Sequence, residues 1–238
     1  MTVPTLLLVA HGTRDPAGAV TAEALADAVA RRLPDVPVGL AFADVRGPSV
    51  TDVLAGGSGP VVVVPAFLSA GYHVRVDLPG QIERAGRPDV RLARPLGAAV
   101  VGAAVDRLVS AGWRPSDAVV LAAAGSSDPR ALADIRRAAA RLSGAIRQPV
   151  DVGYIATGRP GVSEVVARLR RPGTRVAVAS WLLAPGLFHQ WLRRSGADVV
   201  SEPIGVHPLL VDQLVRRYLG QSNRPGSPTL AAAVARGR

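Results

Sequence analysis

The sequence contains no cysteine and no lysine among its 238 residues, and aromatic residues make up only 4% of it. Without a thiol the chain forms no disulfide, no thiolate zinc site and no cysteine nucleophile. Histidine and carboxylate side chains are then the plausible ligands for a transition metal, and the chain has only four histidines. Small aliphatic residues must build the core, which suits a parallel sheet covered by alanine-rich helices.

The positive charge is large but scattered. The net charge is +10, and all 28 basic residues are arginine. Nucleic-acid-binding proteins usually gather such residues on one element, whereas here they are spread over helix faces. We therefore expect a solvated surface and no nucleic-acid partner. A polyanionic ligand stays open, and tight retention on heparin would revive the nucleic-acid alternative.

Long hydrophobic runs are also missing. No stretch approaches the ~18 uncharged apolar residues that a membrane-spanning helix needs. The apolar run at residues 5–10 is short and has no basic segment before it, unlike a signal peptide. We expect a soluble, cytoplasmic protein without a membrane partner.

The chain repeats one pattern of short apolar strands and amphipathic helices. The stretch LLLVAHGTRDP at residues 6–16 returns as LAAAGSSDP, and later segments follow at a similar offset of roughly 113 residues. Strand–helix alternation implies parallel sheets with right-handed crossovers. We predict an α/β fold with two similar four-stranded parallel halves, residues 1–112 and 113–219, that face a central cleft. Residues 220–238 are expected to form a flexible tail.

Three polar residues follow consecutive strands of the first half. His11 ends the first strand, Asp44 follows the second, and His73 follows the third. Because the carboxyl ends of parallel strands lie at one rim of a sheet, these side chains are expected to converge. Two imidazoles and a carboxylate suit a divalent transition metal with open positions. The second half has Ala124 in place of His11 and about Ala156 in place of Asp44, so one site per chain is predicted.

Each of these residues also has an ordinary structural interpretation. A histidine after a strand is often a hydrogen-bonded turn residue, and Asp44 would serve equally well as the cap of a helix starting near Pro48. Asp77 lies four residues after His73. In a helix it would either hydrogen-bond that imidazole or complement the helix dipole.

The other two histidines are less informative. His189 is the counterpart of His73 in the second half, and its role stays open. His207 opens the last helix and is interpreted mainly as a structural residue. Trp181, Phe188 and Trp191 are expected in the core or in the wall of the cleft.

Taken together, the motifs resemble a known family. The segments LLLVAHGTRDP, AFADVRGPSV, VVVVPAFLSAGYHVRVDLP, SWLLAPGLFH and EPIGVHPLLVDQL are similar to those of the sirohydrochlorin chelatases. These class II, ATP-independent enzymes insert Co²⁺ or Fe²⁺ into sirohydrochlorin, and the resemblance extends over residues 3–219. It implies two α/β halves with the metal and the macrocycle in the cleft between them. It also implies a monomer, because this chain fuses two halves that short members of the family supply as two chains.

The resemblance further implies roles for single residues. His11 and His73 match the metal-binding histidines of the family, and Asp44 stands where the family usually has a glutamate. With His11 and His73, Asp44 is expected to be catalytic. A divalent metal, Fe²⁺ in preference to Co²⁺, is expected as substrate, with no organic cofactor and no ATP. Because the tetrapyrrole is a polycarboxylate, Arg14 and Arg75 are expected to bind it.

Two rival functions remain from the residues. AHGTRD is partly similar to the R-H-G motif of histidine phosphatases, but Ala10 stands where that motif has arginine. A non-catalytic carrier of a tetrapyrrole or a metal would use the same fold and the same ligands. Only the rate of metal insertion separates a carrier from an enzyme.

Overall fold

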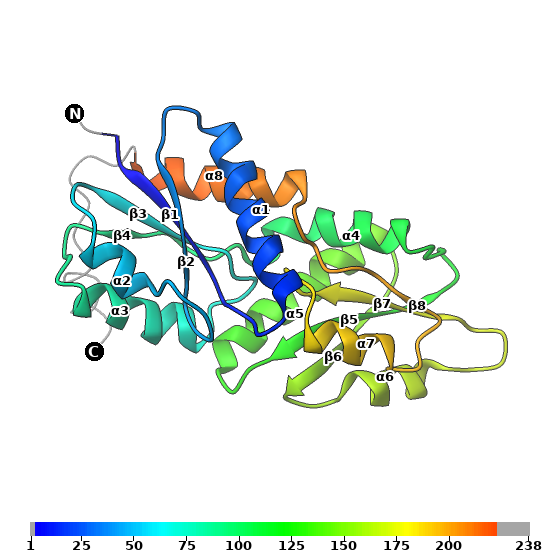
Figure 1. The fold of residues 1–238 in the computed structure, drawn as a ribbon. Helices are drawn as coiled ribbons and strands as arrows, with labels where there is room; N and C mark the ends of the chain where they lie inside the picture. The colour runs from blue at the N-terminus through cyan, green and yellow to red at the C-terminus, as the bar shows by residue number, and fades with distance from the viewer. Residues whose placement is uncertain (1–2, 223–238) are drawn as a thin grey trace. The chain divides into compact units, whose positions relative to one another are not determined.

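Two four-stranded parallel sheets organise the protein (Figure 1). The computed structural model describes residues 3–222. The strands and helices, in chain order, are β1 (Thr5–Ala10), α1 (Pro16–Arg32), β2 (Val38–Phe42), α2 (Val50–Ala55), β3 (Val61–Pro65), the π-helical turn η1 (His73–Asp77), α3 (Leu78–Arg84), β4 (Arg91–Leu92), the 3₁₀ turn η2 (Gly97–Val100), α4 (Val101–Ser110), β5 (Ala118–Gly125), α5 (Pro129–Ile146), β6 (Val150–Thr157), α6 (Val162–Leu169), β7 (Val176–Trp181), α7 (Leu187–Arg193), β8 (Val199–Val200) and α8 (Pro208–Ser222).

The predicted duplication is confirmed by the strand order. The first sheet has the order β2-β1-β3-β4 and the second β6-β5-β7-β8, so equivalent strands take equivalent places. All pairings within both sheets are parallel. The predicted fourth strands are short, because β4 and β8 each pair with a neighbour through two residues only.

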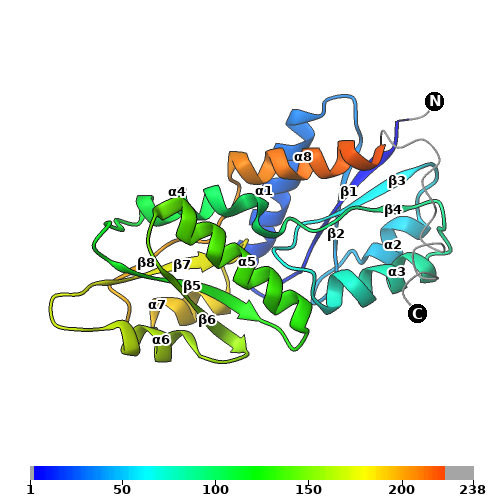
Figure 2. The same ribbon diagram turned by 180° about the vertical axis from the view of Figure 1, so that it is seen from behind.

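Helices cover both faces of each sheet. In the first sheet, α2 and α3 pack against one face, and Leu7, Val9 and Val63 meet Leu54 and Leu78 there. The β1–α1–β2 connection runs across the sheet in the opposite direction from β2–α2–β3, so right-handed crossovers place α1 on the other face. Burial on both sides explains why whole strands are apolar, as in the run of valines in β3. In the second sheet α6 and α7 form the layer equivalent to α2 and α3, which Figure 2 shows from behind.

The Asp-Pro pair of the repeated motif starts a helix in both halves. Asp15 accepts a hydrogen bond from the Ala17 amide at 3.0 Å, and Pro16 lies in the first turn of α1. Asp128 accepts from the Arg130 amide at 2.8 Å at the start of α5, ahead of Pro129. An aspartate cap followed by proline is a strong start signal for a helix, so this part of the motif serves the fold.

The compact units do not coincide with the two sequence halves. One unit comprises residues 3–67, 72–96 and 211–222, and the other comprises residues 68–71 and 97–210. α4, which we assigned to the first half, packs on α5 and β7 of the second unit. Sequence periodicity shows that a helix has an apolar face, but not which sheet that face covers.

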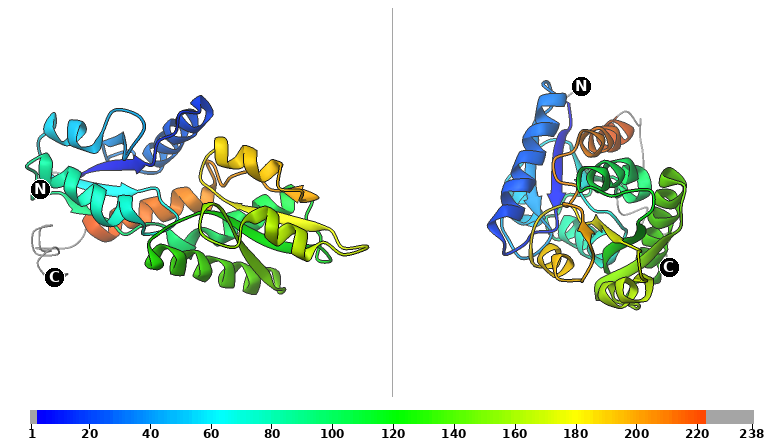
Figure 3. Two further views of the ribbon diagram at one scale, coloured as in Figure 1. Left: turned by 90° about the horizontal axis from the view of Figure 1, so that it is seen from below. Right: turned by 90° about the vertical axis from the view of Figure 1, so that its right-hand side faces the viewer.

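The last helix, α8, completes the first unit. Tyr218 donates a hydrogen bond to the Pro4 carbonyl at 2.6 Å, and Arg32 pairs with Asp212 at 2.6 Å. Figure 3 follows α8, at the orange end of the colour scale, from two further sides. Residues 220–222, which we had placed in a flexible tail, belong to α8. The rest of that predicted tail, 223–238, lies outside the described residues. Within residues 3–222, no helix is long and apolar enough to cross a membrane.

Candidate metal-binding site

Two histidines meet at the carboxyl edge of the first sheet. His11 directly follows β1, and His73 begins η1 after β3, the strand that pairs with β1. Their ring centroids lie 4.5 Å apart, with the ring planes at 76°. Phe67 packs beside both rings, with centroid distances of 6.0 Å to His11 and 6.4 Å to His73. The parallel topology therefore joins two histidines that are far apart in the sequence.

A tight glycine turn fixes the place of His11. Gly12 has a φ of +95°, and a Cβ atom built there would lie 2.0 Å from the Asp44 carbonyl oxygen. The Asp44 amide in turn donates to the His11 carbonyl at 3.0 Å. Only glycine permits this close approach at a positive φ, so the backbone at the end of β2 packs directly on the turn after β1.

The second unit repeats the turn without the histidine. Gly125 has a φ of +89°, and its Cβ position would lie 1.7 Å from the Thr157 carbonyl oxygen. Thr157 rather than Ala156 thus occupies the place of Asp44, because the pairing of β5 with β6 shifts register near this end. Neither residue carries a carboxylate. At these positions the second unit therefore lacks both the imidazole and the carboxylate of the first unit, as expected.

Hydrogen bonds hold both imidazoles in one tautomer. The Nδ1 atom of His11 lies 3.1 Å from the Gly12 carbonyl oxygen, and the Nδ1 atom of His73 lies 3.0 Å from Oδ2 of Asp77. Carbonyl and carboxylate oxygens only accept, so each Nδ1 carries the proton and donates. The lone pair of each ring then resides on Nε2, the form in which neutral histidine binds a metal.

Asp77 orients His73 from one turn further along η1. Of the two roles that the sequence left open for Asp77, the structure shows the hydrogen bond to His73. The other carboxylate oxygen of Asp77 accepts from Nε2 of Gln81 at 3.2 Å. Gln81 also donates to the Ala43 carbonyl at 2.9 Å. Gln81 was not predicted from the sequence, although polar residues spaced by four at positions 73, 77 and 81 indicate it.

Asp44 lies at the same edge of the sheet but is not brought into a ligand group with the histidines. It is exposed, and its Oδ1 atom accepts from the Val45 amide at 2.7 Å. It does not cap the next helix, because Ser49 and Asp52 form the capping box of α2. Among residues 3–222, no three or more His, Asp and Glu side chains are grouped to hold a metal ion. Within the residues that it describes, the structure thus brings together two histidines without a carboxylate as third member of the group.

The surroundings of His11 favour its neutral form. Loss of water around the packed ring is the main effect that lowers its pKa, and nearby His73 adds to it. The hydrogen bond to Gly12 and the charges of Asp44 and Asp77 act in the opposite direction without cancelling the effect. A neutral ring is the state that coordinates a metal.

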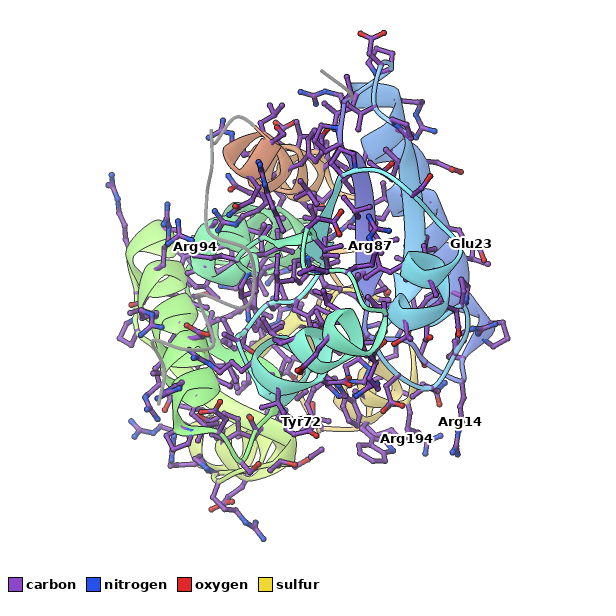
Figure 4. The ribbon with its side chains drawn as sticks, turned by 90° about the vertical axis from the view of Figure 1, so that its left-hand side faces the viewer. Arg14, Glu23, Tyr72, Arg87, Arg94 and Arg194 are labelled. Carbon is purple, nitrogen blue, oxygen red and sulfur yellow. The ribbon has the colours of Figure 1, made fainter. Side chains whose placement is uncertain are left out.

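The two arginines that we expected to bind substrate are both exposed. Arg14 lies in the turn between β1 and α1, and Arg75 lies within η1. Figure 4 labels Arg14 and also Tyr72, the residue before η1. Tyr72 is 64% exposed, and its ring meets that of His73 edge-on at 5.8 Å. An exposed aromatic ring and exposed guanidinium groups thus flank the histidine pair along the chain.

The histidines of the second unit serve the fold. His189 is buried, and its Nε2 atom donates to the Ser201 carbonyl at 3.2 Å. His207 accepts from the Leu209 amide at 3.2 Å, where α8 begins, and its Nε2 lies 3.2 Å from Asp106. His207 thus makes the contacts of a structural residue, and so does His189.

Among the aromatic residues of this unit, Trp181 is in the core, while Trp191 is 43% exposed and packs against Phe188. Trp191 also lines a pocket of about 340 Å³ in this unit, together with Tyr154 and Arg159.

Curated relatives match part of the chain. A sirohydrochlorin cobaltochelatase of Methanosarcina acetivorans is 31% identical over 79 residues, which are 32% of this chain and 61% of that protein. A sirohydrochlorin cobaltochelatase of Methanothermobacter thermautotrophicus is 35% identical over 78 residues, 31% of this chain and 54% of that protein. The chain thus spans less than two thirds of the length of these relatives.

Solved structures match nearly the whole chain. SirB from Bacillus subtilis with Fe³⁺ superposes with a TM-score of 0.81 at 23% identity, covering 93% of this chain and 96% of that one. The sirohydrochlorin chelatase SirB of Bacillus subtilis subspecies spizizenii in complex with cobalt gives a TM-score of 0.79 at 22% identity, covering 94% and 97%. At this identity the likeness establishes the fold.

One family model accounts for both halves. The model described as CbiX matches residues 5–110 and again residues 118–220. The two matches follow the duplication seen in the sheets and include His11, Asp44 and His73 in the first. The resemblance to sirohydrochlorin chelatases inferred from the sequence is thereby confirmed, and the chain belongs to the CbiX family.

Proposed function

We propose that this protein inserts a divalent metal ion into sirohydrochlorin, with Fe²⁺ preferred over Co²⁺. The observation that carries the proposal is the contact between His11 and His73, whose Nδ1 atoms are both engaged and whose Nε2 atoms are free to coordinate. Family membership and the names of the relatives support the same reaction. The metal is a substrate here, and we propose no organic cofactor and no ATP.

The residues suit the steps of metal insertion. Two imidazoles leave most coordination positions of the ion open to water and to the pyrrole nitrogens that replace it. As the ion enters the macrocycle, two pyrrole N–H protons leave. We assign proton acceptance to Asp44, an exposed carboxylate at the same edge of the sheet, and to the histidines once they release the metal.

Because the tetrapyrrole carries several carboxylates, its binding requires cationic side chains on the protein. We assign Arg14 and Arg75 to the carboxylates of the tetrapyrrole, because a guanidinium binds a carboxylate through paired hydrogen bonds. Both side chains are exposed close in sequence to a site histidine. We further propose that the chain works as a monomer in the cytoplasm.

A direct assay tests this function. Purified protein is mixed anaerobically with sirohydrochlorin and Fe²⁺ or Co²⁺, and the absorbance change is compared with the spontaneous rate. We expect a higher kcat/KM with Fe²⁺. His11→Ala and His73→Ala each remove a proposed ligand, and they should cost at least the roughly 100-fold at the upper end for loss of an outer-shell partner. His207→Ala is the matched control, because it deletes an imidazole outside the site.

The possible results separate the alternatives. A wild-type protein that binds sirohydrochlorin without accelerating insertion would be a carrier, and the enzyme proposal would be wrong. Wild-type rates in both His11→Ala and His73→Ala would refute the site assignment while leaving the reaction in place.

A further inference from the structure

We propose that Gln81 is a positioning residue of the metal site, which acts through Asp77 to hold His73 ready for the metal. This inference rests on the proposed function for its ligand, and it assigns a role to a residue that touches neither metal nor macrocycle. The physical basis is a buried amide whose hydrogen bonds connect α3 to η1, to α2 and to the end of β2 in the first unit.

Gln81 is 5% exposed, and both the nitrogen and the oxygen of its amide are hydrogen-bonded. Its Nε2 atom donates to the Ala43 carbonyl at 2.9 Å and to Oδ1 of Asp77 at 3.2 Å. Its Oε1 atom accepts from the Val50 amide at 3.1 Å. The orientation of the amide follows from these partners, because Val50 N–H only donates while the carbonyl and the carboxylate only accept.

The chain of contacts ends at the metal ligand. Asp77 gives one carboxylate oxygen to Gln81 and the other to Nδ1 of His73. The side chain of Asp77 is only 20% exposed, so water contacts it little and a fixed donor matters. Without that donor the carboxylate would rotate away from the plane in which it meets the imidazole. A hydrogen-bonded carboxylate behind a ligating histidine fixes both the tautomer and the direction of the ring.

The same amide also links two segments of the chain that border the site. Ala43 directly follows β2 and precedes Asp44, and Val50 begins α2. The Thr51 hydroxyl adds a hydrogen bond to the Gln81 carbonyl at 3.2 Å. Gln81 therefore ties α3, which continues the turn that carries His73, to the segment that carries Asp44.

The second unit indicates that the fold alone does not require this arrangement. There α6 starts with Glu164 accepting from the Gly161 amide, as α2 starts with Asp52 accepting from the Ser49 amide. The buried polar side chain of α7, His189, donates toward β8 at Ser201. Among the described residues, the side-chain amide that links α3 to the end of β2 and to α2 is therefore found in the unit that carries the histidine pair.

The test uses Gln81→Glu, which keeps the size and the acceptor but loses the donor. Co²⁺ binding is measured anaerobically without tetrapyrrole by the visible absorption of the bound ion. We expect affinity to fall about tenfold, at the low end for an outer-shell partner. Long-range ¹H–¹⁵N NMR should show that His73 loses its single Nδ1–H tautomer. If Gln81→Glu does not fold, Gln81→Met removes the donor without adding charge, and the same two changes are expected.

Gln148→Glu is the matched control. The Gln148 amide donates to the Asp117 carbonyl at 3.0 Å in the second unit, so this substitution removes a similar hydrogen bond away from the site. We expect unchanged Co²⁺ affinity. The double variant Asp77→Asn/Gln81→Glu exchanges donor and acceptor, and it should bind Co²⁺ more tightly than Gln81→Glu alone. A structural role would not produce such a rescue.

The results are decisive in both directions. Wild-type affinity and tautomer in the Gln81 variants, or an equal loss in Gln148→Glu, would overturn the positioning role. If the wild type binds Co²⁺ but does not accelerate insertion, the proposed enzyme function fails while a loss in Gln81→Glu still supports positioning. A wild type that binds no Co²⁺ would overturn both.

Discussion

At the scale of the residue, the environment of an imidazole decides what it can do. His11 directly follows β1, whereas His189 lies in α7, where it is buried and bonded to a carbonyl through Nε2. His11 has its Nδ1 engaged and its ring packed against His73 and Phe67. In His189 the hydrogen bond occupies Nε2, the usual metal-binding nitrogen. In His11 it occupies Nδ1 instead.

The lowered pKa of His11 predicts how stability depends on pH. Its folded value lies below the ordinary 6.5, so the unfolded chain binds the proton more readily. The contribution of neutral His11 is therefore complete above about pH 6.5 and is lost as the pH falls from there through the folded pKa. His11→Gln does not titrate. Urea unfolding of both proteins between about pH 5 and pH 8 should show the wild type losing more stability on acidification.

Titrating groups away from His11 are common to the two proteins and cancel in this comparison. A wild type that gains stability relative to His11→Gln as the pH falls would contradict the prediction. An NMR titration of His11 gives an independent value, expected below that of a model peptide.

At the scale of the element, the glycine turn occurs in both units, so its contribution to folding can be compared with and without the adjacent histidine. Both glycines lie at the end of one strand against the backbone at the end of the next strand in the chain, Gly12 against Asp44 and Gly125 against Thr157. Only the first turn carries a histidine before the glycine. The chain therefore contains an internal control for any change to this element.

Gly12→Ala and Gly125→Ala should both destabilise the protein, each by more than about 2 kcal/mol. A positive φ alone costs about 1–2 kcal/mol for a residue with a Cβ, and the added atom would overlap a carbonyl oxygen. Only Gly12→Ala should also weaken Co²⁺ binding, because it displaces His11. Urea unfolding and metal titration of both variants provide the measurement.

Gly144→Ala serves as the opposite control. Gly144 lies in α5, and nothing lies within 4 Å of its Cβ position. Alanine there should raise stability by about 0.4–1 kcal/mol. Equal losses of Co²⁺ affinity in Gly12→Ala and Gly125→Ala would contradict the assignment of the site to the first turn.

At the scale of the whole molecule, the chain completes its first unit with its last described helix. α8 contributes the Tyr218 hydrogen bond to Pro4 and the Asp212 pair with Arg32. Burial raises the pKa of the Tyr218 hydroxyl, in keeping with its place in the core. The segment that carries the histidines thus depends for its stability on residues more than a hundred positions later.

Substitution of Tyr218 tests this dependence. Tyr218→Phe removes one hydrogen bond and should cost about 1 kcal/mol of unfolding free energy. Tyr218→Ala also empties a buried space and should cost about 3–5 kcal/mol. Tyr72→Ala, at an exposed ring, should stay within about 0.5 kcal/mol. Thermal or urea unfolding distinguishes these cases, and similar losses for Tyr72 and Tyr218 would refute the role of α8.

Much of the site was predictable because it rests on local signals. Strand ends in a parallel sheet share one rim, so His11 and His73 were expected to meet, and spacing by four linked His73 to Asp77. Gln81 was missed, because its partners Ala43 and Val50 lie far away in the sequence. Asp44 was expected to converge with the histidines at this rim as a catalytic residue. It lies at the same edge of the sheet, but its side chain bonds the adjacent amide, and within residues 3–222 it forms no three-residue ligand group with them.

The sequence by itself determined the duplicated α/β architecture, the Asp-Pro helix starts and the loss of the histidine from the second copy. These features repeat along the chain and depend on turn chemistry and periodicity, which are local. Only the tertiary structure decided that α4 covers the second sheet, that α8 completes the first unit, and that a buried glutamine holds Asp77. An apolar face or a buried amide requires a partner, but distance in space, not position in the sequence, selects which partner it finds.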